Sequence, residues 1–181
     1  MDAPCGGYAV LREPGFCRAV SGQPRPIGVC DWCQGQIRLG SILLRVEITH
    51  DPPGDAVAAD GPEWLASLRF AESLRRLAPG YAEYYPVAGP DGSEVPFMQV
   101  ALLQTIRAAQ RSVKGGSKCA RCGGHVQVDL SPLHILAPEE CPPIACLLES
   151  RGVVLVRQDI AAAVTREGMD VGFVDAICVR E

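Results

Sequence analysis

The sequence lacks the features that would place the protein in a membrane or in the secretory pathway. No run approaches the roughly 18 apolar residues that a membrane-spanning helix needs. The opening stretch, MDAPCGGYAVLREPG, has neither the basic start nor the continuous apolar core of a secretory signal. Nine cysteines, an odd number, would leave one over in a fully paired disulfide framework. We therefore expect a cytoplasmic protein whose thiols stay reduced.

The chain also has little positive charge. Its 17 basic residues are outnumbered by 21 acidic ones, which gives a net charge of −4. The densest basic stretch, Arg107 to Arg121, is thin. Because a non-specific nucleic-acid binder usually presents a basic face, nucleic acid is not the expected partner. The sequence contains neither a GxxxxGKS/T loop nor a strand-borne GxGxxG, so no glycine-rich phosphate loop is indicated.

What the sequence does contain is two Cys-x-x-C pairs. They lie in GVCDWCQGQIRLG, residues 28–40, and in SKCARCGGHVQVDL, residues 117–130. Zinc in a structural site is held by four ligands in a tetrahedron, commonly four thiolates. A glycine soon after each pair allows the tight turn, or knuckle, that puts two sulfurs on one side of the backbone. We predict one structural Zn²⁺ per chain. Its four ligands are Cys30, Cys33, Cys119 and Cys122.

The separation of the two pairs along the chain is unusual. A simple zinc ribbon separates its pairs by roughly 15–20 residues, and far more residues lie between Cys33 and Cys119. The two knuckles can still meet, because the entropy of closing a loop grows slowly with loop length. We therefore expect a split zinc-ribbon-like module that pins an N-terminal segment to the centre of the chain.

Other interpretations of these cysteines stay open. One pair could be a redox dithiol, although QGQIRLGSILLRVEI after Cys33 is typical of a turn and a strand rather than of the helix that a redox pair opens. All four could also be plain buried cysteines. His125, three residues after Cys122, could replace one thiolate. Trp32 could pack over the metal loops or anchor a partner.

The simplest expectation is that the remaining cysteines form no second metal site. Cys178 lies in an apolar pattern and is expected to be a buried thiol. Cys141 and Cys146 could form a second metal half-site with Cys5 or Cys17, but separate thiols are the simpler interpretation. The three histidines are scattered, and a nucleophile with a positioned base is not indicated. We therefore expect no enzymatic activity.

Periodicity predicts strands and helices in one α+β domain over residues 1–181. Strands are expected at residues 8–11, 16–20, 41–49, 125–130, 152–157 and 171–179. Helices are expected at residues 63–78, 97–112 and 160–167. Loops are expected at residues 51–62 and 79–96, the second with a turn at Pro90-Asp91-Gly92. Asp159 can cap the last helix, which ends at Gly168, so residues 152–180 form a strand–helix–strand unit.

In the order of these features the chain resembles the double-CxxCG motif family of myxobacteria. The resemblance covers roughly residues 28–179, with two distant knuckles, the helix EWLASLRFAESLRRLAPG between them and the tail VVLVRQDIAAAVTREGMDVGFVDAICV. The second knuckle, CARCGG, matches CxxCG, whereas the first, CDWCQG, has Gln34 where the glycine stands and Gly35 one position later. What carries over by position is the four cysteines.

The resemblance implies a non-enzymatic function. The family includes immunity proteins of kin-discrimination toxin systems, each of which neutralises a cognate toxin, so a protein partner is expected. A mildly acidic surface would suit a basic partner such as a nuclease. Two alternatives stay open. One is a zinc-ribbon module that binds nucleic acid or a transcription complex. The other is a thiol redox protein or enzyme that uses one Cys pair and needs a thiolate of depressed pKa.

Overall fold

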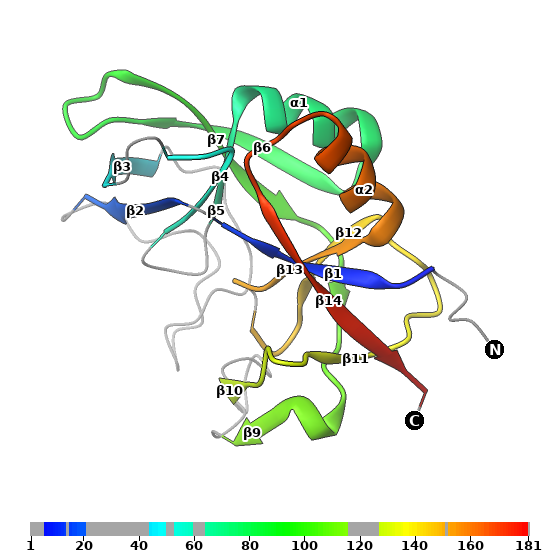
Figure 1. The fold of residues 1–181 in the computed structure, drawn as a ribbon. Coiled ribbons are helices and arrows are strands. Elements are labelled where there is room, and N and C mark those ends of the chain that lie inside the picture. The colour runs from blue at the N-terminus through cyan, green and yellow to red at the C-terminus, as the bar shows by residue number, and fades with distance from the viewer. Residues whose placement is uncertain are drawn as a thin grey trace.

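The computed structural model describes residues 6–13, 15–20, 44–49, 53–59, 64–115, 127–150 and 152–180. Over these residues the chain is α+β, with a six-stranded sheet, a closed barrel, a two-stranded ribbon and two α-helices (Figure 1). The predicted α+β class is therefore confirmed. Within the described residues, no helix combines the length and the apolarity that crossing a membrane requires.

The six-stranded sheet is built around the N-terminal strand. β1 (Tyr8–Arg12) runs antiparallel to β13 (Val154–Arg157) on one side and to β14 (Gly172–Val179) on the other. The order across the sheet is β11-β14-β1-β13-β12-β8. The remaining strands are β8 (Thr105–Ile106), β11 (His134–Leu136) and β12 (Ile144–Leu147). Both faces of β1 are buried, which explains its run of successive apolar residues.

The barrel packs a small core of its own. Its strand order is β2-β3-β6-β7-β5-β4, and it closes because β2 pairs with both β3 and β4. Its strands are β2 (Gly15–Ala19), β3 (Leu44–Ile48), β4 (Ala56–Ala58), β5 (Trp64–Ser67), β6 (Ala82–Ala88) and β7 (Glu94–Leu102). Alternate residues of such strands face the interior, where Cys17, Leu65 and Phe97 pack together.

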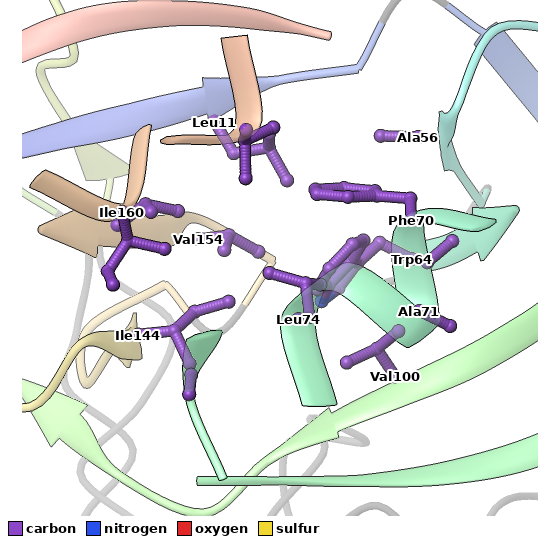
Figure 2. Close-up of a cluster of buried hydrophobic side chains, with 14 of the residues drawn as sticks. Leu11, Ala56, Trp64, Phe70, Ala71, Leu74, Val100, Ile144, Val154 and Ile160 are labelled. Carbon is purple, nitrogen blue, oxygen red and sulfur yellow. The ribbon is translucent and has the colours of Figure 1, made fainter. Parts of the chain in front are cut away.

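A second core joins the barrel to the sheet. α1 (Leu68–Leu77) follows β5, and α2 (Gln158–Arg166) follows β13. Phe70 and Leu74 of α1 and Ile160 of α2 lie in one apolar cluster (Figure 2). Strands of both units add side chains to this cluster, among them Leu11, Ala56, Trp64, Val100, Ile144 and Val154. Barrel, helices and one face of the sheet are thus held together by shared apolar burial.

The helix predicted over residues 63–78 is confirmed from Leu68 onward. Ser67 is its N-cap, because Phe70 N–H donates to Ser67 Oγ at 3.2 Å, a role that serine favours. The residues before it form β5 instead, since they pair with β4 and with β7. Pairing on both sides outweighs their helical pattern.

The C-terminal unit follows the prediction. β13, α2 and β14 occupy the predicted strand, helix and strand, and β1 lies between the two strands in the sheet. Gly168, at φ 70°, follows the last turn of α2 as predicted. Asp159, however, lies in the first turn of α2, and the N-cap is Arg157.

The helix predicted over residues 97–112 is wrong. The region forms β7, β8 and then η1 (Gln110–Ser112), a turn of 3-10 helix. β7 pairs with β6 and with β5. It is buried on both faces, with Phe97 in the barrel core and Val100 in the core shared with the helices. A strand buried on both faces lacks polar alternation, so its apolar residues also fit a helical stripe.

The two predicted loops contain strands. β4 lies within residues 51–62, and β6 lies within residues 79–96. The predicted turn is confirmed, because it closes the β6–β7 hairpin. There Gly92 N–H donates to Gly89 O at 2.9 Å, with Gly92 at φ 87°.

Candidate metal centre

The first predicted knuckle lies in the connection between two paired strands. β2 and β3 run antiparallel, and Val20 N–H donates to Arg45 O at 3.0 Å. Residues 28–40 fall in the chain between these strands. The predicted ligands Cys30 and Cys33 themselves lie outside the described residues. The structure therefore fixes both ends of the segment that carries them.

The second predicted knuckle lies in an equivalent connection. β9 (Val113–Gly115) and β10 (Gln127–Val128) pair antiparallel as a two-stranded ribbon. At its base, Asp129 N–H donates to Ser112 O at 2.7 Å, and Lys114 Nζ lies 2.7 Å from Asp129 Oδ2. The chain between the strands includes the other two predicted ligands and the alternative ligand. These residues, Cys119, Cys122 and His125, lie outside the described residues, as does Trp32.

Both Cys-x-x-C pairs thus belong to connections between antiparallel strands. Such a connection brings its two ends close together, and in the predicted site each pair would contribute half of a tetrahedral donor set. Four thiolates are a set that Zn²⁺ takes in closed structural sites, so the chemistry of the donors fits zinc. Among the described residues, no group of three or more His, Cys, Asp or Glu side chains could hold a metal ion.

Backbone bonds hold the ribbon base against the sheet. His134 on β11 donates its backbone N–H to Ser112 Oγ at 2.7 Å. Ala109 N–H donates to His134 O at 2.8 Å. The ribbon base, at the two ends of the segment that carries the second Cys pair, is therefore fixed to an outer strand of the sheet.

Ser112 and His134 also bring a serine hydroxyl close to an imidazole. Ser112 Oγ lies 3.4 Å from His134 Nδ1, a pairing that in an enzyme would suggest a nucleophile and its base. However, Ser112 is 0% exposed, and its Oγ already accepts the His134 backbone N–H. The contact therefore joins η1 to β11 and presents no accessible nucleophile.

Within the described part of the chain, the cysteines outside the two pairs do not assemble a second metal half-site; Cys5 lies outside the described residues. Cys17 packs in the barrel core, and the buried Cys146 thiol donates to Gln104 O at 3.5 Å. Cys141 takes part in a disulfide bond, so its sulfur is not a thiolate ligand beside Cys146. Cys178, predicted to be buried, is partly exposed, and its partial burial raises its pKa, which makes the thiol less reactive.

Sequence reasoning missed a buried carboxylate at Asp55, which is 4% exposed. Its Oδ1 accepts from Ser67 Oγ at 2.5 Å and from Arg69 Nε at 2.7 Å. Its Oδ2 accepts from Arg69 Nη2 and, at 2.7 Å, from Asp170 N–H. Burial alone would raise the pKa of Asp55, but the hydrogen bonds from Arg69, Ser67 and Asp170 outweigh it and lower that pKa.

Asp55 therefore fastens three elements together. It joins the start of β4 to the β5–α1 junction and to the turn between α2 and β14. A second fastening lies nearby, where Glu167 accepts from Ser73 Oγ at 2.7 Å and from Arg76 Nη2. Both carboxylates hold the helices in place through these hydrogen bonds. No local sequence pattern would have indicated them, because their partners are remote in the chain.

No family model and no curated protein sequence matches this chain.

Proposed function

We propose that this chain is a non-enzymatic binding protein with a structural zinc site, and that it acts as an immunity or inhibitor protein that occupies a cognate toxin. The observation that carries the proposal is the placement of both Cys-x-x-C pairs in connections between antiparallel strands. The toxin as partner comes from the resemblance of the chain to the double-CxxCG family.

Zinc in this arrangement would be a structural brace. One Cys pair belongs to a connection of the barrel, and the other belongs to the ribbon whose base lies on the sheet. Zn²⁺ bound by Cys30, Cys33, Cys119 and Cys122 would tie these two units together and add its binding energy to folding. The four thiolates leave no open coordination position, so zinc would not act on a substrate.

The described carboxylates of lowered pKa support a structural role for the polar residues. Each accepts hydrogen bonds from neighbours, which is what lowers its pKa. They are Asp55, Asp91, Asp129, Asp159 and Glu167.

The expected partner is a basic protein. The chain carries four more acidic than basic residues, and complementary charge accelerates and orients association. A nuclease toxin, which must itself bind nucleic acid, would carry the matching positive charge.

The cytoplasm is the proposed location, because zinc needs its four thiolates reduced. The disulfide at Cys141 favours an oxidising compartment instead. Alkylation of thiols in native cells before lysis distinguishes the cytoplasm from an oxidising compartment. A Cys141 that is alkylated only after reduction would confirm the disulfide and contradict the cytoplasm, whereas alkylation without a reductant would support the cytoplasm.

Neutralisation of a toxin tests the proposed function. The probe is a candidate toxin sought among the products of the genes beside this one, expressed with and without this protein. We expect wild type and Cys178→Ser to restore growth. Cys119→Ser should fail to restore it, because Cys119, unlike Cys178, is a proposed zinc ligand. Growth arrest despite abundant folded protein would contradict the immunity function. Salt-dependent binding of the purified protein to duplex DNA would instead favour the nucleic-acid-binding zinc ribbon.

A further inference from the structure

The six-stranded sheet has an open edge beside the first half of β14. On one side, β14 pairs with β1 over residues 172–176. On the other side, it pairs with β11 only from Ile177 onward, where Ile177 N–H donates to Leu133 O at 2.8 Å. Within the described chain, residues 172–175 therefore have a neighbouring strand on one side only. We call this stretch the β14 edge.

The backbone of the β14 edge offers hydrogen-bonding groups to a further strand. Successive residues of a strand bond to opposite neighbours. Ile177 N–H points away from β1, toward Leu133 O, so the N–H and C=O groups of Asp175 and Phe173, two and four residues earlier, point the same way. No residue takes up these groups in the part of the chain that the structure describes. Such a row of unpaired groups is a template for another strand.

The side chains along this edge are partly apolar and negatively charged. Val174 is 41% exposed, and Ile177, where the edge meets β11, is 45% exposed. Asp175 is exposed, and among the described residues its carboxylate accepts only from the neutral Gln158 Nε2, at 3.2 Å. The exposed Asp170 stands just before the edge. The Asp175 carboxylate therefore lies beside the open backbone, whereas the charge of Asp170 interacts with that of Arg69.

We propose that the β14 edge binds an extended basic strand of the protein partner, which adds to the sheet in line with β11. The proposal rests on the proposed function, and the partner is then the toxin. Backbone bonds to Phe173 and Asp175 would supply affinity, and side-chain pairing would supply specificity.

Charge selects this occupant over a second copy of the chain. Pairing two β14 edges in the register that places Asp175 opposite its copy would bring two carboxylates together, and like charges across paired strands repel. A lysine or arginine on the incoming strand would instead pair with Asp175. The net charge of −4 acts in the same direction.

A first experiment needs no toxin. The ¹⁵N-labelled protein is titrated with a short peptide of alternating valine and lysine and, separately, with one of alternating valine and glutamate. We expect the lysine peptide to shift the amide signals of Phe173 and Asp175 and to slow their hydrogen exchange. The glutamate peptide should leave both signals in place. Equal responses to the two peptides, or shifts confined to other strands, would overturn the proposal.

Two variants of one residue sharpen this test. Asp175→Pro removes an outward N–H without removing a bond to β1, because proline is tolerated where the N–H faces solvent. It should abolish the response to the lysine peptide. Asp175→Lys keeps the backbone and reverses the charge, so it should reverse the preference between the peptides. A thermal melt confirms that each variant is folded.

The toxin itself gives the second arm, measured by calorimetry. We expect Asp175→Pro to bind at least about tenfold more weakly than wild type. Glu72→Lys, the same charge change as Asp175→Lys on the exposed face of α1, should bind as wild type does. A toxin that binds wild type and Asp175→Pro alike overturns the docking edge and leaves the immunity function standing. A toxin that binds neither overturns the immunity function, and the peptides still decide the edge.

Discussion

At the scale of single residues, the structure depends on polar groups whose partners are distant in sequence. Asp55 is the clearest case, since its partners come from β5, α1 and the turn before β14. An unpaired buried carboxylate would be costly, so this set of bonds makes the burial of Asp55 tolerable. Stability should therefore respond to any change that leaves the group or its partners unsatisfied.

Asp55→Asn is expected to lower the free energy of unfolding by about 1–3 kcal/mol, because the charge-assisted bond to Arg69 is lost and buried donors are left poorly paired. Urea denaturation measures the change. Glu72→Gln, on an exposed helical face, is the matched control and should stay within about 0.5 kcal/mol of wild type. Equal effects of the two substitutions would contradict the fastening role of Asp55.

The same carboxylate sets an acid dependence. The pKa of Asp55 is lower in the fold than its ordinary value of 3.8. Its charge therefore stabilises the fold fully above the unfolded-state pKa, and this contribution is lost as the pH falls through the folded-state pKa. The stability difference between wild type and Asp55→Asn should be largest near neutral pH and shrink below about pH 4. Unfolding measured at both pH values tests this, and a gap that widens in acid would contradict it.

Tyr84 shows the opposite situation. Its Oη is buried and has no hydrogen-bond partner, alone among the buried side-chain polar atoms of the described residues, and burial raises its pKa to about 12. Tyr84→Phe should raise stability by about 1 kcal/mol, because an unsatisfied hydroxyl is removed. The Arg75 guanidinium, 4.2 Å from the ring centroid, keeps its contact. A clear loss of stability would show that the hydroxyl has a partner, such as a buried water.

At the scale of elements, the sequence predicted those with one clear period and two clear ends. β13, α2 and β14 were predictable because an apolar run, a short helical pattern and a glycine at the end of the helix follow one another. β7 was not, because burial on both faces removes the alternation that identifies a strand. β4 and β6 lie in segments rich in turn residues, and their strand structure depends on partners far along the chain.

The candidate site likewise has a part that the sequence predicted and a part that it did not. The four cysteines were predictable as ligands from local spacing, because a few consecutive residues define a knuckle. The position of both pairs in connections between antiparallel strands was not predictable. β9 and β10 are very short, and β3 pairs with β2 across a long connection. Asp55 and the β14 edge depend on tertiary neighbours, which no local pattern records.

A close approach between Gly15 of β2 and Pro53, which precedes β4, gives a prediction at this scale. A Cβ atom on Gly15 would lie 2.1 Å from Pro53 O, and a backbone atom cannot rotate away. Gly15→Ala should cost about 1–3 kcal/mol of stability or more, measured by thermal unfolding. Gly89→Ala is the control, because its Cβ would meet the flexible Ser93 Oγ at 2.6 Å and that side chain can turn aside. Equal costs would contradict the constraint on β2.

At the scale of the whole molecule, barrel and sheet are joined by apolar burial on one side, through the cluster that contains α1 and α2. The proposed zinc would supply a second connection, between a barrel loop and the ribbon. Its loss should therefore loosen the contact between the two units as well as unfold the knuckles themselves.

The most direct test is the metal content of the purified protein by mass spectrometry, with a thermal melt of each sample. Wild type is compared with Cys119→Ser and with Cys178→Ser, a cysteine outside both pairs. We expect about one zinc per chain in wild type and in Cys178→Ser, and loss of both zinc and thermal stability in Cys119→Ser. Wild-type protein without metal, in which Cys30 and Cys33 titrate as a reversible dithiol, would contradict the zinc site and favour a redox function.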